Sequence, residues 1–241
     1  MEAGPPRPAS FVGDRDPTVF NVAWRLVTLG GVVRCRAAHA SVRMAHYGPP
    51  CRPDRARRAL SPHFVRFAAL FYGSLTVVAA VWCGLRDFDL PLLGESLAWS
   101  LLLGLSTAAC TISLGLVAYR LIPALRAISE DLAPRLVDGA RVRDLVLISV
   151  FSGIGEEAFF RGAVLQEFGL VISSLLFGLA HVGPDRRYLV WTLWAVLAGF
   201  VFGALFELSG GLLAPVVAHA GHNAATLLLW KRSRSGKGMA P

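Results

Sequence analysis

The chain has 241 residues, of which 54% are hydrophobic and only 17% are charged, and its mean hydropathy is +0.54. About a quarter of the residues of a soluble domain are usually charged. This composition excludes an ordinary soluble domain and favours an all-α, polytopic membrane protein. The net charge is +8, and positions 1–66 hold eleven arginines against four acidic residues, so the basic character belongs to one arm. We interpret this arm as a cytoplasmic flank that contacts anionic lipid, and we expect no nucleic-acid partner.

Three regions are expected along the chain. Residues 1–62 form a basic, poorly ordered cytoplasmic arm, because Pro-Pro pairs at 5–6 and 49–50 stand among arginines. The sequence leaves open whether this arm is functional or precedes a true start at Met44. Residues 63–231 form a transmembrane helical domain, and residues 232–241 form a basic cytoplasmic tail.

The transmembrane domain contains six apolar segments, which we expect to be helices because runs of this length cannot be strands of an ordinary sheet. The fourth segment is short against the roughly 20 residues of a full span. Gly199-xxx-Gly203 in the fifth segment predicts close packing between helices. The segments are 64–85, 97–119, 144–160, 170–182, 188–208 and 211–230.

Charges between the segments alternate along the chain. Arginine and lysine concentrate before the first segment, in loop 120–143, at 185–187 and after the sixth segment, whereas the other connections are acidic, nearly neutral or uncharged. The positive-inside rule therefore predicts a multi-pass protein of the cell membrane with both termini in the cytoplasm.

The third segment carries Glu156 and Glu157, and Arg161 directly follows it, at a depth where each charge costs about 2.5–3.5 kcal/mol. Glu157 and Arg161 are four residues apart, with the acid first, so they can pair on one face of a helix. Glu156 points about 100 degrees away and lacks that partner. A free carboxylate beside small residues suits general acid or base chemistry. We expect Glu167 and Glu207, near segment ends, to be solvated.

Two later segments carry further polar groups. Phe177 and His181 lie one turn apart in the fourth segment, and His219 and Asn223 lie one turn apart in the sixth. Imidazole and carboxamide groups are donors that can stabilise an oxyanion. An acid, a histidine and a His/Asn pair on three membrane helices therefore predict an active site within the membrane.

The order Glu-Glu-x-x-x-Arg, Phe-x-x-x-His and His-x-x-x-Asn on successive helices resembles the CPBP intramembrane proteases, which include type II CAAX prenyl endopeptidases, bacterial Abi proteins and lysostaphin resistance protein A-like proteins. The resemblance covers a core at about 144–226. It implies peptide-bond hydrolysis without a covalent intermediate. Glu156 and His181 would activate a water, and His219 and Asn223 would stabilise the oxyanion. Glu157, Arg161 and Phe177 would support them.

Several alternatives stay open at this stage. Glu156, His181 and His219 could bind zinc as two histidines and a carboxylate, although we favour a mechanism without a metal or other cofactor. A proton-coupled transporter could use the same buried acids, and an immunity scaffold could carry them without catalysis. The expected partners are the lipid bilayer and a membrane-associated protein or peptide substrate, whose identity the sequence does not give.

Overall fold

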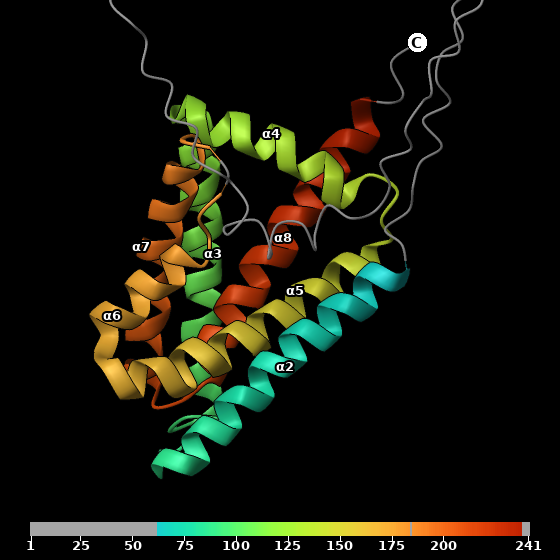
Figure 1. The fold of residues 1–241 in the computed structure, drawn as a ribbon. Coiled ribbons are helices and arrows are strands. Elements are labelled where there is room, and N and C mark those ends of the chain that lie inside the picture. Colours follow the sequence, from blue (N-terminus) through green and yellow to red (C-terminus); the bar gives the residue numbers. More distant parts are fainter. Residues whose placement is uncertain (1–61, 184, 238–241) are drawn as a thin grey trace, which may run out of the picture. The chain divides into compact units, whose positions relative to one another are not determined.

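A computed structural model describes residues 62–183 and 185–237, and every regular element in this part of the chain is helical (Figure 1). The predicted all-α class is confirmed. The predicted arm, 1–62, lies outside the described residues except for Pro62, and so does the tail beyond Lys237. The elements are α2 (Pro62–Arg86), α3 (Leu97–Leu121), α4 (Pro123–Val137), α5 (Val142–Glu157), the π-helix η1 (Ala158–Val164), α6 (Leu165–Leu179), α7 (Tyr188–Ser209) and α8 (Leu213–Lys237).

Four helical stretches among the described residues are long and apolar enough to cross a membrane: Phe64–Arg86, Leu97–Leu121, Val142–Leu179 and Tyr188–Ser209. Large apolar side chains lie exposed on these stretches, which suits contact with lipid rather than water. The chain is therefore a polytopic helical membrane protein. The predicted sixth segment lies in α8 and is not one of the four, because polar side chains such as His219 and Asn223 interrupt it.

The predicted third and fourth segments lie in the single helical stretch Val142–Leu179. The chain nevertheless turns sharply within it, because Gly169 has φ 80° and ψ 170°. Only glycine adopts this region readily, since any Cβ would be strained there. Figure 1 shows α6 turning back after η1, so that it packs against both η1 and α7. The two predicted segments are therefore distinct, and the turn directly precedes Leu170, where the fourth was expected to begin.

The basic connection 120–143, which we expected to be a loop, contains the helix α4. Pro123 stands at its first turn, where the missing N–H costs nothing. Leu125, Ile128 and Ala133 are buried on one side of α4. This helix packs on α3, α7 and α8 and crosses one end of the bundle (Figure 1).

The connections gather at two opposite ends of the bundle according to their charge. At the basic end, Lys231 of α8 donates to the carbonyl of Ala140 at 2.6 Å, and Arg234 pairs with Asp138. At the other end, the amide of Glu95 bonds to Ser209 O at 3.0 Å and the amide of Leu212 bonds to Pro91 O at 2.9 Å. The basic segments 120–143 and 231–237 thus lie together, apart from the weakly charged connections.

Helix α5 lies between α2 and α8, and two glycines permit the close approach. A Cβ at Gly153 would come within 2.9 Å of the Ala220 Cβ on α8, and one at Gly155 would come within 2.5 Å of the Tyr72 carbonyl on α2. The neighbouring helices therefore occupy the space that a side chain would need at either glycine. The residue that follows Gly155, Glu156, is thereby held where three helices meet.

Candidate active site

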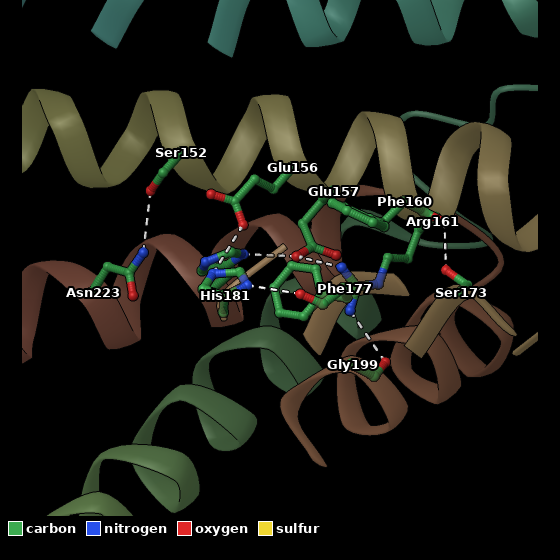
Figure 2. Close-up of polar contacts among 11 residues, drawn as sticks. Ser152, Glu156, Glu157, Phe160, Arg161, Ser173, Phe177, His181, Gly199 and Asn223 are labelled. Carbon is green, nitrogen blue, oxygen red and sulfur yellow. Dashed lines mark hydrogen bonds and ion pairs between the residues drawn. The ribbon is translucent and has the colours of Figure 1, made fainter. Parts of the chain in front are cut away.

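The helix that carries the two glutamates changes its geometry directly after them. In η1 the amide of Leu165 bonds to the carbonyl of Phe160, five residues earlier. Such π-helical turns are rare and are often found at functional sites. The hydroxyl of Ser173 on α6 also donates to this carbonyl, at 2.8 Å, and so ties α6 to η1 (Figure 2).

Glu157 is fully buried and is held by two donors. Arg161 Nη1 donates to Glu157 Oε1 at 3.1 Å, and His219 Nδ1 lies 2.7 Å from the same oxygen. The ion pair expected from the sequence therefore forms, and the histidine of α8 joins it. Because a lone charge at this depth is costly, the arginine and carboxylate stabilise each other in the bundle.

Arg161 is itself enclosed. Its Nη2 donates to the carbonyl of Gly199 at 3.1 Å, and its guanidinium lies 4.5 Å from the ring centre of Phe177 and 5.6 Å from that of Phe202. Cation–π contacts of this kind are strongest where water is excluded. The guanidinium therefore connects η1, α6 and α7 around Glu157.

Glu156 lies on a different side of the helix and is not held in this way. Its Oε2 is buried without a hydrogen-bond partner and lies 3.8 Å from Nε2 of His181 (Figure 2). Tyr72 of α2 also interacts with this carboxylate through its phenol group. A buried polar atom without a partner indicates strain, a catalytic role or a place for water. Glu156 thus remains available beside a histidine.

His181 lies in the turn directly after α6 and is oriented by the end of that helix. Its Nδ1 lies 2.7 Å from the carbonyl of Phe177, and since a carbonyl only accepts, Nδ1 carries the proton. The ring also packs on that of Phe177, with 4.8 Å between centres. This arrangement leaves Nε2 directed at Glu156.

His219 and Asn223 lie one turn apart on α8 and face α5. His219 stacks on Phe202 with ring centres 5.1 Å apart, and Asn223 Nδ2 donates to the hydroxyl of Ser152 at 3.1 Å. The structure therefore brings all seven residues expected from the sequence into one cluster.

Sequence reasoning missed four contributors to this cluster: Tyr72, Ser152, Phe202 and the carbonyl of Gly199. Gly199 belongs to the glycine pair, and a Cβ there would come within 2.9 Å of the Ser174 backbone, as close packing predicts. Nothing in the sequence indicated that its carbonyl would accept from Arg161. Glu167, expected to be solvated near a segment end, belongs to an exposed pair with Arg86 and also accepts from Trp82.

The described residues thus form a helical membrane protein with an acid, arginine and histidine cluster at its centre. Residues 139–225 match the family model described as type II CAAX prenyl endopeptidase Rce1-like. This match confirms the resemblance inferred from the motifs, and all seven motif residues fall within the matched range.

A similar curated protein is the uncharacterized protein YpbD of Bacillus subtilis (strain 168). It is 24% identical over 116 residues, which make up 48% of this chain and 61% of YpbD. The chain therefore spans less than two thirds of the length of that relative. The comparison with solved structures found no significant match.

The possible zinc site would need Glu156, His181 and His219 to share one metal ion. Among the described residues, no three His, Cys, Asp or Glu side chains are placed to do so. The Nδ1 of His219 is directed at Glu157 instead of at Glu156. The metal-free mechanism stays a prediction, which a chelator experiment can test.

Proposed function

We propose that this protein is an intramembrane endopeptidase of the glutamic type, which cleaves a membrane-associated protein or peptide. The observation that carries the proposal is the buried Oε2 of Glu156, which lies 3.8 Å from Nε2 of His181 and outside the ion pair of Glu157 and Arg161. The match of residues 139–225 to the Rce1-like family supports it.

The gap between Glu156 and His181 suits a bridging water. The separation of 3.8 Å exceeds a direct hydrogen bond and would place one water within hydrogen-bonding distance of both atoms, once the helices part enough to admit it to the buried Oε2. His181 Nε2 carries no proton in the neutral tautomer, so it accepts one hydrogen of the water while Glu156 accepts the other. The water oxygen attacks the peptide carbonyl carbon as Glu156 takes its proton, and Glu156 later returns this proton to the leaving amine.

His219 and Asn223 are placed to bind the oxygen that becomes negative. Nδ1 of His219 donates to Glu157, so Nε2 can donate only when the ring carries both protons, a charge that Glu157 stabilises. The carboxamide of Asn223 has two N–H groups, of which one donates to Ser152 and the other remains for the oxyanion. Donors of this kind are worth a factor of about 10²–10³ in kcat each.

Location and orientation belong to the same proposal. The clustering of the basic segments at one end of the bundle fits the positive-inside rule, so we place that end and both termini in the cytoplasm. A cysteine introduced at Arg232 would then react with an impermeant maleimide only after the cell membrane is opened.

The test is a cleavage assay with purified protein in detergent and a library of membrane-spanning peptides, with fragments identified by mass spectrometry. Wild type is compared with Glu156→Gln, with and without a zinc chelator. Glu207→Gln is the matched control, because Glu207 is an exposed acid on α7.

Cleavage that persists in the chelator and in the control, but is lost in Glu156→Gln, is the expected result. Loss of cleavage in the chelator alone would move the chemistry to a metal ion. Cleavage by Glu156→Gln at the wild-type rate would remove this carboxylate from the mechanism, and a wild type that cuts no peptide would contradict the endopeptidase proposal.

A further inference from the structure

A cavity of about 110 Å³ opens beside the candidate active site. Three of the predicted catalytic residues, His181, His219 and Asn223, line one part of it. Its other walls come from α3 and α7 and include Trp191 and Trp194. A group that occupies this cavity would therefore lie directly next to the reacting atoms.

The cavity is predominantly apolar and borders the lipid-facing surface. Leu114, Leu197 and Val201 belong to its lining and are also exposed on the outer surface of the bundle. In a membrane these side chains would touch acyl chains, so the cavity can be reached sideways between α3 and α7. Two of its polar side chains form a hydrogen bond with each other, since His222 Nδ1 lies 3.2 Å from Thr111 Oγ1.

We propose that this cavity is a substrate subsite that binds one large apolar side chain flanking the scissile bond. The proposal rests on the endopeptidase function argued above. An apolar cavity of about 150 Å³ holds a benzene molecule, so a volume of 110 Å³ suits an aliphatic side chain such as leucine and only tightly an aromatic ring. Within lipid, selection arises from packing rather than from escape from water.

Gly115 on α3 offers a way to fill the cavity. A Cβ placed there would lie 3.7 Å from Cε1 of His222 and 3.8 Å from Cζ2 of Trp194, which is ordinary van der Waals contact. Gly115→Ala therefore fits without displacement, whereas Gly115→Leu extends between these two rings. Gly84→Leu is the matched control, because Gly84 is exposed on α2 and has nothing within 4 Å of its Cβ position.

The experiment measures which side chains flank the cleaved bonds. A library of membrane-spanning peptides with five randomised central positions is digested, and the cleavage sites are read by mass spectrometry. Wild type and Gly84→Leu should enrich leucine over alanine at one flanking position by at least about 10-fold, the scale on which pockets discriminate apolar groups. Gly115→Leu should reverse this preference towards alanine, with Gly115→Ala in between.

A complementary variant guards against simple misfolding. Trp194→Ala enlarges the cavity and should shift the preference towards aromatic residues, a gain that a damaged protein cannot show. Three outcomes overturn the proposal: a flat profile in the wild type, a leucine preference that Gly115→Leu leaves unchanged, or an unchanged profile in Trp194→Ala. In each of these the endopeptidase function stands, whereas a wild type that cuts nothing refutes both proposals.

Discussion

The buried pair of Glu157 and Arg161 should show a large energetic coupling. Both side chains are at most 1% exposed, and they are joined at 3.1 Å. Glu157→Gln leaves the arginine charge without its counter-ion, and Arg161→Met leaves the carboxylate without its arginine partner. Removal of one partner of a buried pair costs about 3–5 kcal/mol, while replacement of both is often nearly neutral. We therefore expect each single variant to be much less stable than the double variant.

The expected loss of stability can be measured as a fall in melting temperature. For a chain of this size a change of 1 kcal/mol corresponds to about 2–4 °C, so each single variant should lose about 6–20 °C and the double variant should recover most of it.

Cys83 offers a probe for this measurement, because it is buried and its thiol donates to the carbonyl of Gly162 in η1. A thiol-reactive dye will therefore report opening at η1 itself, once Cys35, Cys51 and Cys110 have been replaced by serine.

The chain offers a matched control for this cycle. Arg86 and Glu167 are joined at 2.7 Å, but the arginine side chain is 55% exposed. Water and salt screen such a pair, so Glu167→Gln and Arg86→Met should change the melting temperature little. The reasoning is refuted if the buried and exposed pairs respond alike, or if the effects of Glu157→Gln and Arg161→Met simply add.

Three further variants test the surroundings of the site. Tyr72→Phe removes the phenol beside Glu156 and keeps the ring, so kcat should fall about 10-fold or more at an unchanged melting temperature; an unchanged kcat would show that the hydroxyl is idle. Ser152→Ala frees Asn223 from its acceptor and should lower kcat with little effect on KM, whereas an equal loss in KM would indicate a binding role. Gly169→Ala forces a Cβ into a glycine-only conformation, and the strain of about 1–3 kcal/mol should lower the melting temperature, unlike Gly84→Ala.

The sequence could predict the features of this fold that depend on local spacing. Hydropathy located the helices because a span must be long and apolar. The interval of four residues between Glu157 and Arg161 predicted their pairing, because both an α-helix and a π-helix place residues four apart on nearly the same face. The separation of Glu156 from that pair followed from the same geometry. Each of these features lies within a single helix, so the residues of that helix are enough to predict it.

The missed features depend on contacts between segments. The carbonyl of Gly199 binds Arg161 across 38 residues, and the phenol of Tyr72 reaches Glu156 across 84 residues. No periodicity encodes such contacts, because they depend on how the helices pack. The π-helix is similar, since Ala158–Val164 has no residue that requires it. Likewise, α4 was hidden by its low hydropathy, and only its buried face of Leu125 and Ile128 shows that it packs on the bundle.

In the proposed mechanism the two adjacent glutamates take different roles, and the cluster keeps its charge balanced throughout. In the proposed resting state, Glu156 and Glu157 are negative, and Arg161 and doubly protonated His219 are positive, so the four groups sum to zero. When Glu156 takes the proton of the water, the new negative charge is on the oxyanion, next to His219. The sum is again zero, and no net charge is created in a medium where it would be costly. Without Arg161, the same step would start and end with a net negative cluster, at a depth where net charge is costly. In the proposed mechanism, the pair formed by Glu157 and Arg161 therefore keeps the charge of the cluster balanced around Glu156, although neither side chain need touch the substrate.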